Sequence, residues 1–104
     1  MTIPSLQHLE RLQALLQTLK SEGIEMESHQ YDGPAFGNFV VVLAKGRARV
    51  RFVWDGKESI LTVESQEVQN KADKQTWEHD AFIKVSSADD VFAEIGSNAE
   101  AMLL

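Results

Sequence analysis

The sequence predicts a single α+β domain over residues 1–104: an N-terminal helix, an antiparallel meander of four to five strands and a C-terminal helix, in the order α-β-β-β-β-β-α. Leucine recurs at helical spacing near the N-terminus, apolar and polar residues alternate through the middle of the chain, and helical spacing returns near the C-terminus. A chain of 104 residues is long enough to bury one core and too short for two.

The first predicted element is a helix from Pro4 to Glu22, with Ser5 as its N-cap. Gly23 follows Lys20 at the place where a glycine commonly ends a helix. One apolar stripe runs along the helix, formed by Leu6, Leu9, Leu12, Leu15, Leu16 and Leu19. Because the stripe is too short for a coiled coil, we expect it to pack on a sheet.

Five strands are predicted by β-branched and aromatic content and by alternation. Their ranges are Ile24–Tyr31, Phe39–Ala44, Arg47–Trp54, Glu58–Glu64 and Trp77–Val85. A loop rich in glycine and proline covers residues 31–38, and the polar residues 65–75 lead to the last strand. Lys45-Gly46 and Asp55-Gly56 are the predicted two-residue turns of the two central hairpins.

The last element is a helix that begins at Ser87, with Asp90 at the spacing of a capping box. Its apolar positions are Val91, Phe92 and Ile95. Gly96 leaves two alternatives. It ends this helix before a short second one over residues 98–103, or it lies inside one continuous helix at a cost of about 1 kcal/mol.

The two predicted turns set a strand register that collects the apolar residues on one face of the sheet. This predicted core face consists of Phe39, Val41, Leu43, Ala48, Val50, Phe52, Trp54, Leu61 and Val63. A slip by one residue would bring arginines into the core, at a cost of several kcal/mol for each unpaired guanidinium. The arginines therefore help to specify which way the sheet faces.

The opposite face is the predicted interaction surface. It carries Val40, Val42, Arg47, Arg49, Arg51, Val53 and Ile60. In the predicted register, Arg51 lies between Val40 and Ile60, and Arg47 pairs across strands with Glu64. A mixture of apolar residues and arginine is typical of protein interfaces. The alternatives are that this face is solvated or covered by the C-terminal helix, or that it binds a second copy or another protein.

Charge limits the partners. Sixteen acidic against ten basic residues give a net charge of -6, which opposes polyanions and anionic membranes and favours basic proteins. A nucleic-acid stacking surface needs aromatic residues beside the arginines. Phe52 and Trp54 alternate with the arginines and point to the other face, so we predict no nucleic-acid partner. The longest apolar run, residues 39–44, is too short to span a membrane, and we predict no membrane partner.

The absence of cysteine excludes disulfides, thiolate metal sites and cysteine catalysis, and it favours a reducing compartment. The N-terminus has no apolar segment typical of a signal peptide. We therefore expect a cytoplasmic protein, bacterial in style.

The sequence contains no catalytic motif and no metal-ligand spacing, so we predict no catalytic residues, metal or cofactor. The three histidines, His8, His29 and His79, are expected at the surface. A small-molecule site is the alternative, in a pocket between the first helix, the 31–38 loop and the sheet. Its candidate residues are His29, Tyr31, Asp32 and Phe36, with Trp54 nearby.

The leading hypothesis is a non-enzymatic, small acidic module that binds another protein or associates with itself. Adaptors, immunity proteins and secretion chaperones share this layout, by analogy only. The alternative hypothesis is a small-molecule-binding domain or small enzyme with a pocket near the 31–38 loop. Partner, ligand, oligomeric state and pathway are not specified by the sequence.

Overall fold

A computed structural model describes residues 6–32, 37–67, 77–86 and 88–104. It confirms the predicted α+β fold with its antiparallel meander. The elements are α1 (Leu6–Lys20), β1 (Glu25–Asp32), β2 (Asn38–Lys45), β3 (Ala48–Asp55), β4 (Ile60–Glu67), β5 (Glu78–Lys84) and α2 (Ala88–Leu103). The five strands form one sheet in sequence order, each antiparallel to its neighbour.

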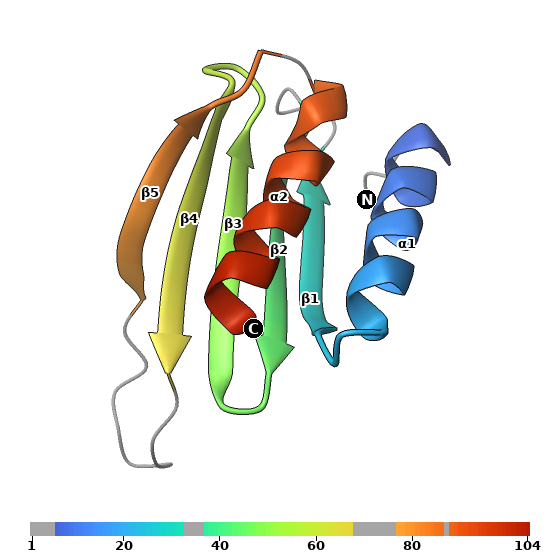
Figure 1. Cartoon of the computed structure of the whole chain (residues 1–104). Helices are drawn as coiled ribbons and strands as arrows, with labels where there is room; N and C mark the ends of the chain where they lie inside the picture. Colours follow the sequence, from blue (N-terminus) through green and yellow to red (C-terminus); the bar gives the residue numbers. More distant parts are fainter. Residues whose placement is uncertain (1–5, 33–36, 68–76, 87) are drawn as a thin grey trace.

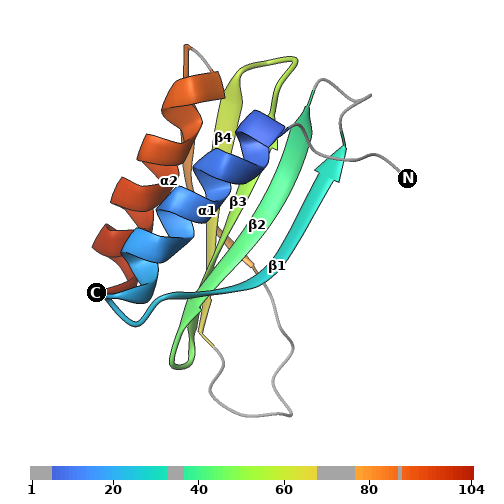
Figure 2. The same cartoon turned by 90° about the vertical axis from the view of Figure 1, so that its right-hand side faces the viewer.

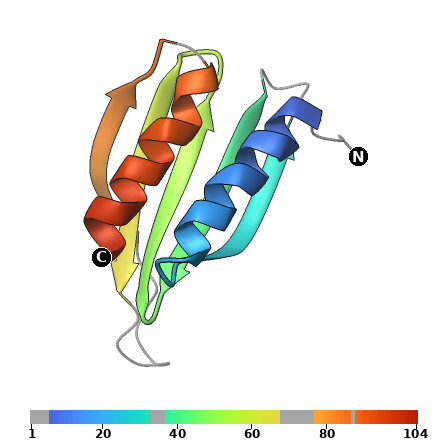
Figure 3. The same ribbon diagram turned by 45° about the vertical axis from the view of Figure 1, so that its right-hand side comes forward.

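Both helices lie on the same face of the sheet (Figures 1 and 2). α2 packs against β2 and β3, while α1 packs against β1 and against α2. Figure 3 shows the two helices side by side over the sheet. The described residues therefore form two layers, and neither α1 nor α2 lies on the second face of the sheet.

The core lies between the sheet and the two helices. The predicted core face is confirmed, although Ala48 is only half-buried. The helices contribute Leu12, Leu19, Val91, Phe92, Ile95, Ala99 and Leu103 to the same cluster. Sheet residues such as Val41, Leu43 and Phe52 are fully buried under them, as expected when two amphipathic helices cover one sheet face.

α1 ends as its sequence predicts. Gly23 has a φ of +81°, and its N–H donates to the carbonyl of Lys20 at 3.0 Å. The N–H of Ile24 donates to the carbonyl of Leu19 at 3.1 Å. These two bonds form a Schellman motif, in which glycine tolerates the left-handed backbone. The predicted N-cap, Ser5, lies outside the described residues.

The leucine stripe of α1, which is expected to pack on the sheet, does so from Leu12 onward and not at its start. Leu6 and Leu9 are exposed, at 71% and 41%, whereas His8 is buried. The core-facing stripe of α1 begins at His8, which lies four residues before Leu12 and packs on rings of β1 and β2, so Leu6 and Leu9 lie to the sides of the stripe.

The β2–β3 register differs from the predicted one. Lys45 pairs with Ala48, so the two-residue turn is Gly46-Arg47 rather than Lys45-Gly46. Gly46 has a φ of +62°, which suits the first position of a type II′ turn. Val41 consequently pairs with Phe52, two residues beyond the predicted partner.

The β3–β4 connection is also longer than predicted. Asp55 pairs with Ile60 across a loop over residues 56–59. The Oδ1 atom of Asp55 accepts hydrogen bonds from the N–H groups of Lys57 (3.0 Å) and Glu58 (3.1 Å), which stabilises the longer loop. Phe52 therefore pairs with Val63 instead of Ser59, a displacement of four residues. Because both displacements are even, every side chain keeps its predicted face.

Both end strands contain a bulge. In β1 the register changes between Met26 and Ser28, so Glu27 is an extra residue. In β5 the register change makes Asp80 the extra residue. Each bulge shifts the alternation of its strand by one residue. Beyond the bulge, the residues that simple alternation would turn away from the helices point toward them.

α2 is one continuous helix from Ala88 to Leu103, which decides between the two alternatives at Gly96. A Cβ atom placed on Gly96 would lie 2.9 Å from Cδ1 of Leu15. The glycine thus allows α1 and α2 to pack closely. The predicted cap, Ser87, lies outside the described residues.

Candidate functional site

The outer face of the sheet, which is the face opposite α1 and α2, is the candidate site (Figure 2). α2 packs on the same face as α1, so the alternative in which the C-terminal helix covers the outer face is excluded. The strand register defines two rows across it from β1 to β5. The apolar row is Gln30, Val40, Val53, Thr62 and Phe82. The charged row is Ser28, Val42, Arg51, Glu64 and His79.

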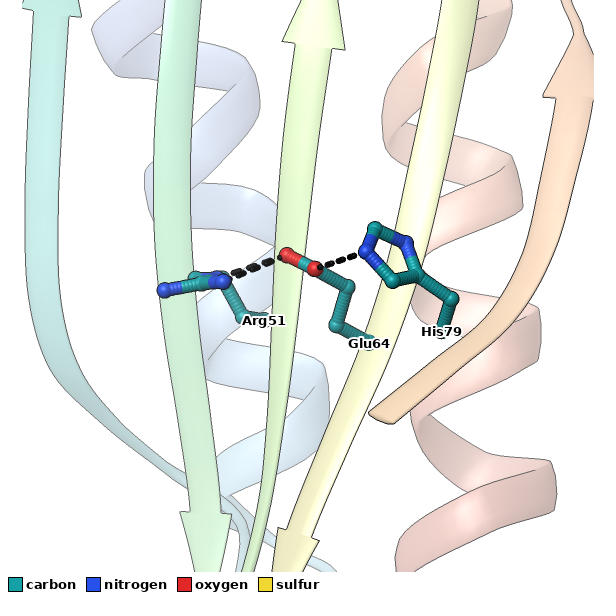
Figure 4. Close-up of polar contacts among 3 residues, drawn as sticks. All are labelled: Arg51, Glu64 and His79. Carbon is teal, nitrogen blue, oxygen red and sulfur yellow. Dashed lines mark hydrogen bonds and ion pairs between the residues drawn. The ribbon is translucent and has the colours of Figure 1, made fainter. Parts of the chain in front are cut away.

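The charged row contains a hydrogen-bonded array across β3, β4 and β5 (Figure 4). The Oε1 atom of Glu64 accepts from Nε and Nη2 of Arg51, each at 2.8 Å. The Oε2 atom of Glu64 lies 3.2 Å from Nε2 of His79. Although Glu64 lies on the face without helices, it is only 5% exposed. Both carboxylate oxygens are therefore held in place, and the array is rigid.

Two aromatic rings support this array. The guanidinium of Arg51 lies 4.5 Å from the ring centroid of Trp77, within the range of a cation–π contact. The ring of His79 stacks on Phe82, with centroids 5.6 Å apart and an interplanar angle of 20°. The residues around Glu64 thus form a continuous layer of planar groups.

A second ion pair spans the other half of the outer face. The Nε atom of Arg49 in β3 donates to Oε2 of Glu27 at 2.6 Å. Because Glu27 is the bulged residue of β1, its side chain reaches over β2 to β3. Both arginines of β3 consequently have a carboxylate partner on this face.

A hollow of about 490 Å³ lies at the β1–β3 side of the outer face. Its outer-face lining is Gln30, Asp32, Asn38, Val40, Val53 and Asp55, and the core-facing residues Tyr31, Phe39 and Trp54 complete it. At the β5 side of the same apolar row, Phe82 projects into solvent and is 69% exposed. One row therefore contains both a protruding phenyl ring and a hollow.

The residues of the predicted interaction surface lie on the outer face, with one exception. Val40, Val42, Arg49, Arg51 and Val53 belong to β2 and β3 and lie on the outer face, with Ile60 in β4. Arg47 lies in the turn instead, so its predicted pairing with Glu64 is wrong. Arg51 takes that place, because the longer loop moves β4 along by four residues.

The predicted ligand-loop residues are separated. Tyr31 and Asp32 line the hollow, whereas His29 points to the helix side, where it pairs with Val41 in the sheet. Phe36 lies outside the described residues. The sequence predicts a pocket between the first helix and the sheet. The hollow opens on the outer face instead, and no residue of α1 lines it.

The prediction that all histidines lie at the surface is wrong for His8. This residue is 8% exposed, and its Nε2 atom lies 3.0 Å from Nε2 of His29. Rings of Tyr31, Phe39 and Phe92 surround it at centroid distances of 4.6, 4.9 and 5.3 Å. The bulge at Glu27 turns His29 toward the core, and an alternation count without the bulge misses this.

The alternation of polar and apolar residues does not place Trp77, His79 and Phe82 on the arginine face. The pattern of β5 alternates, but the bulge at Asp80 separates His79 from Phe82 by three positions while leaving both on the same face. The placement of Phe52 and Trp54 in the core is confirmed. The aromatic residues beside the arginines come from the last strand instead.

Within the described ranges, no group of three or more potential metal ligands converges. Neither helix there is long and apolar enough to cross a membrane. The polar residues of the hollow already have structural roles, since Oδ1 of Asn38 accepts from the N–H of Gly56 at 2.7 Å and Asp55 holds the following loop.

The chain shows no match to a family model, to a curated protein or to a solved structure. Function is therefore inferred from the outer face itself.

Proposed function

We propose that this chain is a non-enzymatic protein-binding module and that the outer face of its sheet is the binding surface. The observation that carries the proposal is the pairing of an exposed phenyl ring, Phe82, with a preformed array around Glu64 on a sheet face that neither helix covers. Interfaces combine apolar and aromatic residues with arginine in this way.

Rigidity of the face supports this function. Arg51 is held by Glu64 and stacks on Trp77 before any partner binds. A long side chain that is already ordered loses less conformational freedom on association. Binding of a partner to this array therefore costs less side-chain entropy than binding to arginines that are free to move.

Strand addition at the sheet edges is a less favourable mode of binding. β1 and β5 are the two edges, and each has a bulge and exposed charges, among them Glu25, Glu78 and Asp80. Bulges and charges are the features by which proteins prevent edge-to-edge pairing. A partner is expected to lie on the face and not along an edge.

A nucleic-acid partner is disfavoured for a different reason than the sequence suggested. Trp77 and Phe82 do provide aromatic rings beside the arginines. However, Glu27 and Glu64 neutralise Arg49 and Arg51, and the whole chain has a net charge of -6. Phosphate binding needs uncompensated positive charge, so a protein partner fits better.

Photo-crosslinking tests the proposal in the cells that make the protein. A benzophenone amino acid at position 82 is expected to form a crosslink to a protein, whereas the same probe at Gln17, exposed on α1, is expected to form none. Absence of any crosslink at position 82, or equal crosslinking at both positions, would exclude the outer face as a binding surface.

The hollow supports a second candidate function, the binding of a small molecule beside Tyr31 and Asp32. Its volume of about 490 Å³ lies in the range of ligand pockets. A ligand present at 100 times its Kd would add about 2.7 kcal/mol of stability. A metabolite screen by thermal shift that gives no stabilisation would exclude this candidate.

A further inference from the structure

We propose that the partner of the outer face is a second copy of this chain, related by a twofold axis that runs parallel to the strands between β3 and β4. The inference rests on the proposed function of that face. It follows from three properties of the face: its shape, its charge pattern and its area.

The shape is self-complementary. Phe82 in β5 and Val40 in the hollow belong to the same apolar row, three strands apart. A twofold rotation about the proposed axis lays β5 of one chain over β2 of the other. Positions along the strands do not change, so each row of one chain lies over the same row of the other. Phe82 of each chain then lies over the hollow of the other. An isologous interface requires such a reciprocal contact.

The same axis also pairs the charges. It lays β3 of one chain over β4 of the other, and in the charged row this places Arg51 opposite Glu64 of the second copy, twice. Each carboxylate then lies between two arginines and each arginine between two carboxylates. Burial of the charged row against itself therefore leaves neither Arg51 nor Glu64 without an opposite neighbour, which is the condition for burying an ion pair at an interface.

The net charge does not oppose this arrangement. The two arginines of β3 are balanced by Glu27 and Glu64 within the face, while exposed acids such as Glu10 and Glu100 lie on the helices. When two sheets pack face to face, the helix layers lie farthest apart. Repulsion between them is weakened further by salt, whose screening length is about 8 Å at physiological ionic strength.

The area reaches the minimum for a specific interface. The axis overlaps β2 to β5, and four strands spaced about 4.8 Å apart, each seven or eight residues long with a rise of about 3.3 Å per residue, give a face of about 500 Å². Two such faces bury about 1,000 Å² in total, which is the smallest area expected of a specific protein interface. Sheets packed this way align within about 30° of each other, so the rows of the two chains overlap best near the axis.

Cysteine crosslinking tests the axis directly, since the chain contains no cysteine. The axis places Val42 of one chain opposite His79 of the other. Chains carrying Val42→Cys and chains carrying His79→Cys are mixed and treated with a short bismaleimide. We expect a crosslinked dimer in the mixture and little in either variant alone, because like residues would be displaced by three strands, about 14 Å along the face.

The crosslinking results distinguish the proposed axis from other arrangements of two chains and from the absence of a dimer. Crosslinking of one variant with itself as strong as in the mixture would overturn the proposed axis, and no crosslinking in any sample would overturn the second copy as partner. The in-cell probe at position 82 separates this from the proposed function. A crosslink there to a different protein would keep the outer face as a binding surface and remove the second copy, whereas no crosslink would remove both.

Discussion

His8 of α1 and His29 of β1 lie with their Nε2 atoms 3.0 Å apart, beneath a cluster of aromatic rings. One nitrogen of the pair must donate its proton to the other, so at most one of the two rings carries a charge in the native state. Burial lowers the pKa of His8 to about 4, with a smaller contribution from the charge that His29 would carry. Burial also lowers the pKa of His29.

This pair predicts a loss of stability in mild acid. The pKa of His8 is lower in the folded protein than the ordinary value of 6.5, so the unfolded chain binds the proton first. The contribution to stability is complete above pH 6.5 and is lost as the pH falls toward about 4. At pH 5 we expect a loss of about 2 kcal/mol relative to pH 7.5, measured by urea denaturation. His8→Gln should flatten this dependence; equal slopes in both proteins would contradict the assignment.

Glu64 and Glu27 form a matched pair of tests for the outer face. Glu64→Gln should destabilise the protein by about 1–2 kcal/mol, because a buried carboxylate that accepts from Arg51 and faces His79 loses its charge. Glu27→Gln should cost less than about 0.5 kcal/mol, since its side chain is 43% exposed. The two free energies of unfolding are compared at equal protein concentration. Equal losses would show that Glu64 is not held as described.

The contact between Gly96 and Leu15 predicts how α2 tolerates side chains. Gly96→Val should destabilise the protein by about 2 kcal/mol, because the added methyl groups meet Leu15 across the helix interface. Ala93→Val, one turn earlier at an exposed position, should cost no more than about 0.7 kcal/mol from helix propensity. If Gly96→Val and Ala93→Val have the same cost in urea denaturation, the helices do not pack closely at this glycine.

Ser59 predicts a stabilising substitution. It has a φ of +56°, which is unfavourable for a residue other than glycine. Its carbonyl accepts a hydrogen bond from the N–H of Val85 at 2.9 Å, so the backbone is held in this conformation. Ser59→Gly should raise the free energy of unfolding by about 0.5–1 kcal/mol, and Ser59→Ala should not. A loss of stability in the glycine variant would contradict the expectation.

The fold, and the sheet face on which each side chain of β2 to β4 lies, could be predicted. An even shift in register leaves every side chain on its face, and only an odd shift would move it to the other face. The misplaced turns at Gly46 and Asp55 shift the strand registers by two and four residues, and the predicted core face is still correct. The pairs across strands depend on the full register, so Arg47 was wrongly paired with Glu64. Hydrogen bonds of Asp55 to the loop backbone decide the register, and they are not apparent from the Asp-Gly pair itself.

The candidate site could be predicted only in its central part. Val42 and Arg51 were assigned to the outer face because their strands are regular. His79 and Phe82 were not, because the bulge at Asp80 interrupts the alternation of β5. The burial of His8 escaped prediction for a related reason, since it depends on the bulge at Glu27 that turns His29 inward.

The molar mass in solution, measured by light scattering over a series of concentrations, tests most directly whether the outer face binds a second copy. The comparison uses two aspartate variants at equally exposed residues, Phe82 at 69% on the outer face and Leu6 at 71% on α1. We expect twice the chain mass of 11.6 kDa for the unmodified protein and for Leu6→Asp, and a single chain mass for Phe82→Asp. A single chain mass for the unmodified protein at every concentration, or a dimer that Phe82→Asp leaves intact, would contradict the account.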